Sequence, residues 1–335
     1  MKKLAWIDSV RGMACLIVLF AHIFASDPNI AIYFSGCGKI GVWLFFIISA
    51  FLLTLPYLNQ TKVSIKNTGE YYLKRIFRIY PCYLIVLIIS LPIGFIDDFQ
   101  ALMKHTLLLE GTGHFWTIPV EIKFYLILPL IVWVLNKISS FKWRIIFIGI
   151  LGLILECIYP YFSYKENSIL LRWYFPVFLM GMIVALIYNE LVKKNKSSYL
   201  CDVFSFVIII GIIISTPGVR YLIFGIAPDG YLQNKYLFMG IAWSVFFLCV
   251  AFSKKSKIFF GNSKFLSWIG KISFPFYLVH YIVLQYLNTF IGNVWVRGFC
   301  TFIISAVIAW ILNQFVENPM IKYGRKVTTH VFKKN

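Results

Sequence analysis

The chain has 335 residues, of which 60% are hydrophobic and only 13% charged, and its formal net charge is +19. Charged residues make up about 25% of soluble domains, so this composition excludes a soluble globular domain and predicts an all-α, polytopic integral membrane protein. Cationic loops on one side of a membrane explain the positive charge, so we expect no nucleic-acid partner. The seven cysteines are scattered without a Cys–His spacing typical of metal sites, so we expect neither a metal nor a disulfide framework.

Windows of about twenty apolar residues predict ten transmembrane helices. They cover residues 5–25, 40–58, 79–96, 115–135, 143–159, 170–189, 203–219, 236–252, 272–290 and 295–316. Pro217 and Gly218 interrupt the seventh span, and 99–109 is expected to form a short amphipathic helix at the interface. The first span lacks a cleavage site, so it is expected to remain as a signal anchor.

The Lys and Arg residues outside these spans alternate from loop to loop. Twenty-three lie in the connections on the side of the N-terminus and in the C-terminal tail, whereas seven lie in the opposite loops. Because cytoplasmic loops carry the excess of Lys and Arg, the pattern predicts an even number of spans with both termini cytoplasmic. We expect one transmembrane domain over residues 1–321, followed by a basic cytoplasmic tail over residues 322–335.

The first predicted span carries three ionisable residues, Asp8, Arg11 and His22. Ionisable groups are costly in the hydrocarbon region and usually mark a cavity or a partner, so each is a candidate site residue. The step of eleven residues from Arg11 to His22 brings both to within ~20° of one helix face, ~16 Å apart along the axis. With the N-terminus inside, Arg11 lies toward the cytoplasmic half and His22 toward the outer half, which predicts a site reachable from both sides.

Further polar residues accompany other spans. Arg75 and Arg78 cluster at the cytoplasmic start of the third, where guanidinium groups suit phosphate oxygens. Glu121 lies within the fourth span, and a lone buried carboxylate needs a partner. The remaining candidates flank Glu121 or lie in the ninth span: Trp116, Tyr125, Ser273 and His280.

Six stretches, taken in chain order, resemble the signature segments of the acyltransferase 3 family of integral-membrane acyltransferases. They are IDSVRGMACLIVLFAH (7–22), GVWLFFIISAFLL (41–53), YLKRIFRIYP (72–81), HFWTIPVEIKFYLILPL (114–130), IGKISFPFYLVH (269–280) and VENP (316–319). The resemblance therefore covers nearly the whole chain. The chain departs from the family pattern at Trp43, Ala50, Thr117 and Pro119.

The resemblance implies a bacterial-type inner-membrane O-acyltransferase that uses cytoplasmic acetyl-CoA as its acyl donor. The acceptor is then a hydroxyl of a glycan, either a lipid-linked saccharide or a surface polysaccharide. His22 is expected to be the catalytic base, with Arg11 and Glu121 as its charged neighbours, because acyl transfer to a hydroxyl requires removal of a proton. Arg75 and Arg78 are expected to hold the donor phosphates. Asp8, Trp116, Tyr125, Ser273 and His280 are expected to bind substrate or support the site, and no metal is implied.

Each candidate also has a structural alternative that the residues leave open. His22 is alternatively a histidine that packs helices together, and Arg11 is equally the ion-pair partner of Asp8. Arg75 and Arg78 fit ordinary positive-inside anchoring. Glu121 is either a tie between helices, a partner for one of the arginines, or a group that orients an imidazole.

Other patterns carry less weight. Gly36–Gly41 fits Gly-x-Gly-x-x-Gly, but no strand precedes it, so it fails as a dinucleotide-binding fingerprint. His22 and Asp27 have the His-x4-Asp spacing of glycerolipid acyltransferases, whose surrounding sequence does not match. His105, His114 and His330 show no metal-like spacing and are expected to be solvated or interfacial.

A transporter of a lipid-linked sugar or polysaccharide is the alternative from another functional class, because intramembrane Arg, Glu and His also suit an anionic substrate path. No inverted repeat typical of transporters is visible. Loss of a transporter reduces the surface polymer, whereas loss of a transferase leaves the polymer and removes its esters. The sequence leaves the oligomeric state open.

Overall fold

The computed structural model describes residues 4–58, 65–158, 165–194 and 197–333. All named elements in these ranges are helices, so the predicted all-α class is confirmed. The helices are α1 (Ala5–Ala25), α2 (Cys37–Leu58), α3 (Ile65–Ser90), α4 (Phe99–Thr106), α5 (Thr117–Lys137), α6 (Phe141–Ile158), α7 (Phe175–Leu191), α8 (Tyr199–Ile214), α9 (Pro217–Phe224), α10 (Tyr236–Phe252), α11 (Ser256–Asn262), α12 (Lys264–Lys271), α13 (Ser273–Asn288), α14 (Val294–Leu312) and α15 (Asn318–Lys333).

Each of the ten predicted spans coincides with at least one helix. By length and composition, five helical stretches in the described ranges suffice to cross a membrane: Ala5–Ala25, Ala31–Leu58, Gly113–Lys137, Phe175–Lys194 and Val294–Phe332. The pair α8–α9 makes a sixth if it counts as one span bent by 85°. This break lies at Pro217, as predicted, because proline begins a new helix more readily than it continues one. The chain is therefore a polytopic membrane protein, although fewer of its helices than the predicted ten meet these criteria.

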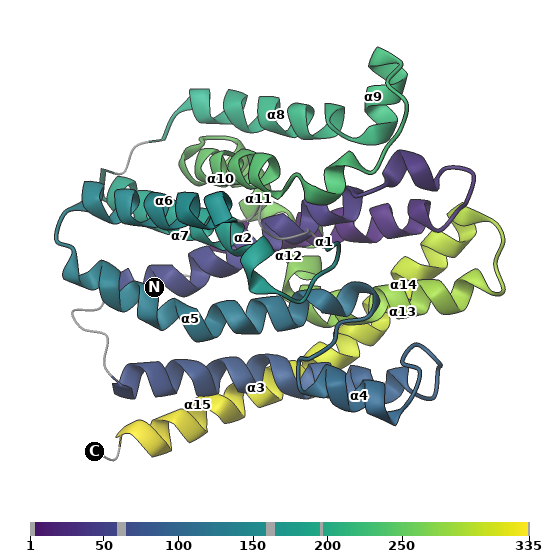
Figure 1. Cartoon of the computed structure of the whole chain (residues 1–335), viewed down its shortest axis with the longest axis horizontal. Coiled ribbons are helices and arrows are strands. Elements are labelled where there is room, and N and C mark those ends of the chain that lie inside the picture. Colours follow the sequence, from purple (N-terminus) through teal and green to yellow (C-terminus); the bar gives the residue numbers. More distant parts are fainter. Residues whose placement is uncertain (1–3, 59–64, 159–164, 195–196, 334–335) are drawn as a thin grey trace.

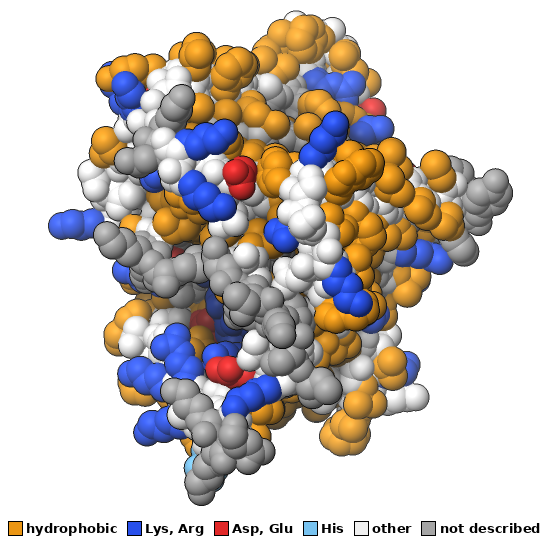
Figure 2. Space-filling view, turned by 90° about the vertical axis from the view of Figure 1, so that its left-hand side faces the viewer, with side chains coloured by type: hydrophobic (Ala, Val, Ile, Leu, Met, Phe, Trp, Pro, Cys, Tyr) orange, Lys and Arg blue, Asp and Glu red, His pale blue; other side chains and the backbone are white. Residues whose placement is uncertain are grey.

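The helices lie side by side in a bundle with α1 and α2 at its centre (Figure 1). In that view α8 and α10 lie on one side of this centre, and α3 and α15 lie on the other. Helix α3 begins and α15 ends at the left-hand end of the bundle, and Lys and Arg side chains are spread over that end (Figure 2).

Glycines fix helix α1 tightly against its neighbours. A Cβ on Gly12 would lie 2.1 Å from the carbonyl oxygen of Leu266 in α12, and a Cβ on Gly270 would lie 1.7 Å from that of Asp8. On the α2 side, a Cβ on Gly41 would lie 2.5 Å from the carbonyl oxygen of Ala14. Small residues let helix backbones approach closely in membranes, so α1 is held rigidly between α12 and α2.

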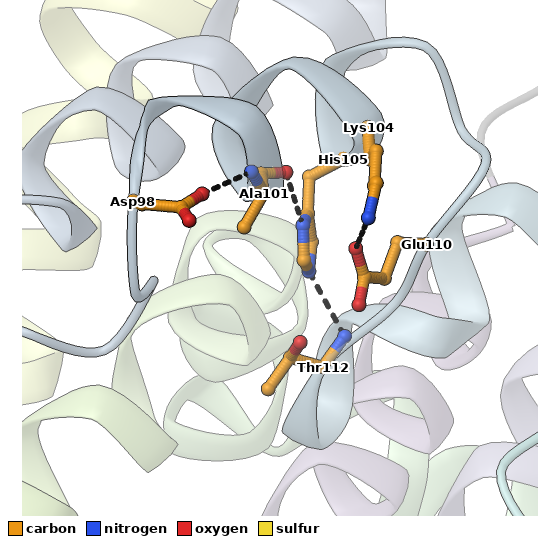
Figure 3. A network of polar contacts seen from close by, with 6 residues as sticks. All are labelled: Asp98, Ala101, Lys104, His105, Glu110 and Thr112. Carbon is orange, nitrogen blue, oxygen red and sulfur yellow. Dashed lines mark hydrogen bonds and ion pairs between the residues drawn. The ribbon is translucent and has the colours of Figure 1, made fainter.

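Helix α4 and the loop after it form a small polar network (Figure 3). Asp98 caps the helix by accepting a hydrogen bond from the Ala101 N–H at 2.7 Å. The His105 ring donates from Nδ1 to the Ala101 carbonyl at 2.8 Å and accepts at Nε2 from the Thr112 N–H at 2.9 Å. His105 is fully buried, so the expectation of a solvated or interfacial histidine is wrong here. This ring fixes the chain just before His114.

The chain continues from α14 into α15 through a π-helical turn over Asn313–Glu317. Within it, Asn313 Nδ2 donates to the Glu317 carboxylate at 2.7 Å. Helix α15 then packs along α3, where a Cβ on Gly324 would lie 2.7 Å from the Cβ of Phe77. Most of the expected basic tail is therefore a helix laid against α3.

Candidate active site

Two cavities lie at different levels of helix α1. The first, here called the arginine cavity, measures about 100 Å³ and is lined from α1, α2, α3, α5 and α13. Arg11, Arg75 and Arg78 reach it together with Glu121. Three guanidinium groups face one carboxylate, so these four side chains leave an excess of positive charge that suits an anionic ligand.

Hydrogen bonds hold one side of the arginine cavity. Arg11 donates from Nη2 to the hydroxyl of Ser273 at 2.8 Å, and that hydroxyl donates to the carbonyl of Gly270 at 2.8 Å. The Nε of Arg75 is buried without a hydrogen-bond partner among the described residues. A buried donor of this kind is costly unless a ligand or water satisfies it.

Glu121 is fixed by a chain of hydroxyl groups. The Tyr125 hydroxyl, one turn later in α5, donates to the Glu121 carboxylate, and Ser49 in α2 lies 2.9 Å from that hydroxyl. Because the Tyr125 proton is used on Glu121, Ser49 is the donor in this contact. Arg11, Arg75 and Arg78 all interact electrostatically with Glu121, so the carboxylate belongs to the arginine cavity.

The second cavity, here called the histidine pocket, measures about 570 Å³ and lies at the other end of α1. His22, His114 and Tyr281 line it, and Trp116 adds an aromatic surface. The pocket is also lined by three amide side chains, which both donate and accept hydrogen bonds, and by one cation and one anion. These residues are Asn167, Gln233, Gln285, Lys39 and Glu166. Lys39 and Glu166 lie 3.5 Å apart as an ion pair.

The hydrogen bonds of His22 and His280 define their tautomers. His280 Nδ1 lies 2.7 Å from the carbonyl oxygen of Tyr277, which only accepts, so Nδ1 carries a proton. In the neutral ring Nε2 of His280 is then an acceptor, and it lies 2.9 Å from Nδ1 of His22. The two ring planes differ by only 7°, which suits an in-plane N–H···N bond. His22 therefore donates from Nδ1 and keeps a free lone pair on Nε2.

That basic nitrogen faces helix α2 at Gly38. A Cβ built on Gly38 would lie 3.2 Å from Nε2 of His22, and both residues line the histidine pocket. The pocket therefore offers one unprotonated imidazole nitrogen next to a position that lacks a side chain. Such a nitrogen can remove a proton from a hydroxyl group placed beside it.

His114 joins this pair although its position in the chain is remote from both. Its Nε2 donates to the Leu278 carbonyl at 2.8 Å, and its ring centre lies 5.3 Å from that of His280. His114 is 3% exposed, so the expectation of a solvated histidine is wrong for this residue. Its Nδ1 is buried and has no hydrogen-bond partner among the described residues.

Only a thin partition separates the two cavities. Val42 and Tyr277 line both of them. The Tyr277 hydroxyl donates to the His114 carbonyl at 2.9 Å and accepts from Thr117 at 3.2 Å, which holds the ring in place. The cavities are therefore neighbouring compartments that share Val42 and Tyr277.

The predicted site residues divide between these compartments. Arg11, Arg75, Arg78, Glu121, Tyr125 and Ser273 line the arginine cavity, whereas His22 and Trp116 line the histidine pocket. His280 contacts His22 directly. Asp8 lies in the first turn of α1, near Arg11 but outside both linings. Among the described residues no cluster of three or more His, Cys, Asp or Glu has the geometry of a metal site.

The sequence matches the family model described as "Acyltransferase domain" over residues 4–314. The chain belongs to the acyltransferase 3 family. The two compartments lie wholly within the matched region.

Curated relatives include the O-acetyltransferase OatA of Staphylococcus aureus, 25% identical over 99% of this chain and 60% of the relative. The putative O-acetyltransferase SACOL0978 of the same species is 23% identical over 97% of this chain and 59% of the relative. The chain therefore spans about three-fifths of the length of these relatives. No solved structure matches it.

Sequence reasoning missed His114 and the polar lining around Lys39. His114 follows a loop rather than lying on an apolar helix face, so periodicity gives no signal for it. Lys39 stands at the start of α2, where it looks like an ordinary flanking cation. A histidine next to the Phe-Trp pair of the fourth signature segment is the one available sequence signal for His114.

Proposed function

We propose that this acyltransferase moves an acetyl group from acetyl-CoA to a hydroxyl of a glycan. The bond between His22 Nδ1 and His280 Nε2 carries this proposal, because it leaves Nε2 of His22 free as a base in a pocket large enough for a sugar. The family supports acyl transfer, and the relatives named as O-acetyltransferases support the acetyl group and an oxygen acceptor.

The arginine cavity is the proposed donor site. Arg11, Arg75 and Arg78 present more positive charge than Glu121 balances, and guanidinium groups bind phosphate oxygens in a bidentate manner. Coenzyme A carries several phosphates on one end and the thioester on the other. With the phosphates at the arginines, its extended arm passes Val42 and Tyr277 and brings the thioester to the histidine pocket, ~16 Å along α1.

The histidine pocket is the proposed acceptor site. Sugar rings combine apolar faces with many hydroxyl groups, and this pocket combines Trp116 and Tyr281 with amide, ammonium and carboxylate groups. The relatives named as O-acetyltransferases support an oxygen acceptor, which a sugar hydroxyl provides.

In the reaction, an acceptor hydroxyl beside Gly38 attacks the thioester carbonyl carbon while Nε2 of His22 takes its proton. The carbon–sulfur bond then breaks, and the proton passes to the departing sulfur, so that an ester and free coenzyme A result. His280 accepts the hydrogen bond from Nδ1 of His22 throughout. It holds the imidazole in the reactive tautomer, as an orienting group does for other catalytic histidines.

We further propose the membrane arrangement expected from the loop charges. The protein then lies in a bacterial inner membrane with ten spans and both termini in the cytoplasm. The arginine cavity faces cytoplasmic acetyl-CoA, and the histidine pocket faces the outer leaflet, where glycan intermediates are exposed. Helices α3, α6, α10 and α13 complete the ten spans in this arrangement.

The test compares the O-acetyl content of surface glycans in a host strain that carries the wild type or His22→Ala at matched level. His330→Ala is the control, because His330 is an exposed histidine on α15, outside both compartments. We expect His22→Ala to lower the ester content to that of a deletion strain without changing the amount of polymer. A fall in exported polymer with its esters retained would instead support a transporter.

A further inference from the structure

An apolar groove of about 810 Å³ lies beside the histidine pocket, between helix α1 and the bent arm formed by α8 and α9. From α1 it is lined by Met13, Ile17 and Phe20, and from α8 by Ile209 and Ile213. No charged residue lines it. A groove of this composition within a membrane protein excludes a polar ligand but accommodates a hydrocarbon chain.

Specific contacts build the groove. The arm bends at Ser215, whose carbonyl accepts a hydrogen bond from the Tyr231 hydroxyl, and Pro217 begins α9 just after the bend. Gly218 then packs against Tyr33, since a Cβ there would lie 3.2 Å from both the Cβ and the carbonyl oxygen of Tyr33. Helix α9 therefore closes one end of the groove, while α8 packs on α10 and stands across the groove from α1.

The groove adjoins the histidine pocket. Ala21 and Phe34 line both of them, and Ala21 directly precedes His22. A molecule with a polar head in the pocket and a hydrocarbon chain in the groove would therefore pass Ala21. The polar part of such a molecule would meet Nε2 of His22, and its apolar part would meet a mainly apolar lining without charged side chains.

We propose that the groove binds the hydrocarbon chain of a lipid-linked saccharide whose sugar occupies the histidine pocket. This inference rests on the proposed function and narrows its acceptor to a glycan that is still attached to a lipid. In a bilayer the hydrocarbon chain is already out of water, so the groove orients the acceptor rather than concentrating it. The sugar hydroxyl is then presented to His22 from the membrane side.

The test uses the full-length protein in lipid nanodiscs and a long-chain alkyl glycoside with a photoreactive diazirine on its chain. We expect cross-links to α1 and α8 that an excess of unlabelled alkyl glycoside removes, whereas methyl glycoside and phosphatidylglycerol do not. Ile213→Trp fills the groove and should reduce labelling by about tenfold. Ile210→Trp is the matched control, because Ile210 lies on the same helix, is exposed and does not line the groove.

If phosphatidylglycerol displaces the probe, the groove binds ordinary bilayer lipid only, and the proposal is overturned. Equal labelling of the Ile213→Trp and Ile210→Trp proteins would do the same. Both variants are first compared with wild type by thermal unfolding, and Leu222→Trp, at the α9 end of the groove, replaces Ile213→Trp if that protein does not fold.

The proposed function is tested by a different measurement, the ester content of the glycans. If His22→Ala leaves glycan esters unchanged while labelling of the groove persists, acyl transfer at His22 is wrong and the glycolipid site stands. If His22→Ala removes the esters while labelling is absent, the acyltransferase stands and the groove proposal is wrong.

Discussion

His22 and His280 are 258 residues apart in the chain, yet Nδ1 of the first lies 2.9 Å from Nε2 of the second. Nδ1 of His280 donates to the Tyr277 carbonyl, so Nε2 of His280 must accept the hydrogen bond from Nδ1 of His22. In the proposed reaction this pair is the base and its orienting partner, without any carboxylate. Glu121 lies in the other compartment.

The first prediction concerns His280 as a positioning residue. In His280→Ala the His22 ring loses its acceptor, so the wrong tautomer becomes populated and kcat should fall by about a hundredfold or more. In His280→Gln the amide oxygen can accept from Nδ1 of His22, so part of the activity should return. The measurement is the rate of acetyl transfer with saturating acetyl-CoA.

Thermal unfolding in detergent provides the control for this pair of variants. If the alanine and glutamine proteins are equally inactive although both are folded, His280 has only a packing role.

The second prediction concerns the open position beside the base. A methyl group at Gly38 would lie 3.2 Å from Nε2 of His22 and occupy the place of the acceptor hydroxyl. Gly38→Ala should therefore lower kcat/KM for the acceptor by about tenfold or more, since crowded contacts of this kind cost about 1–3 kcal/mol. The affinity for coenzyme A, measured by calorimetry, should stay unchanged.

Gly261→Ala is the matched control, because a Cβ on Gly261 meets no atom within 4 Å. Normal acceptor kinetics in Gly38→Ala would show that the acceptor hydroxyl approaches His22 from another direction.

The helices themselves were largely predictable, because long apolar windows are a local property of the chain. Arg11 and His22 were also predicted to share one face of α1. Sharing a face did not place them in one cavity, however, since ~16 Å of helix separates them and Val42 and Tyr277 close the space between. Arg11 and Glu121 were expected beside His22, but they line the arginine cavity and His22 lines the histidine pocket.

The partners of His22 were harder to predict for a physical reason. His280 was expected only to support the site, because nothing local in the sequence shows which of two distant helices meets α1. His114 was missed because the buried ring of His105, rather than helix periodicity, fixes the loop before it. Contacts of this kind depend on the packing of the whole bundle.

The third prediction separates donor binding from membrane anchoring at the start of α3. Arg75→Ala and Arg78→Ala should each weaken coenzyme A binding by about tenfold to a hundredfold, because a hydrogen bond to a charged group contributes about 1.5–3 kcal/mol. Lys74→Ala should have little effect, since Lys74 pairs with Glu70 on the same helix at a partly exposed site. Calorimetry on the purified proteins measures all three.

The salt dependence of this binding offers an independent check, because contacts with phosphates weaken as ionic strength rises. An effect of Lys74→Ala as large as that of Arg75→Ala would indicate a general surface potential instead of a donor site.

The last prediction concerns the partition itself. Val42 is buried and lines both compartments, so in the proposed path of the donor its side chain limits what passes from the arginine cavity to His22. Val42→Ala should widen this passage and raise the ratio of propionyl to acetyl transfer, whereas Val42→Leu should lower it. Coenzyme A affinity should stay constant in both variants, because the phosphates bind at the arginines and not at Val42. If the ratio changes in the same direction in Val42→Ala and Val42→Leu, the donor does not pass at Val42. Loss of stability alone cannot change the ratio in opposite directions in the two variants. A path that bypasses Val42 would leave the ratio unchanged.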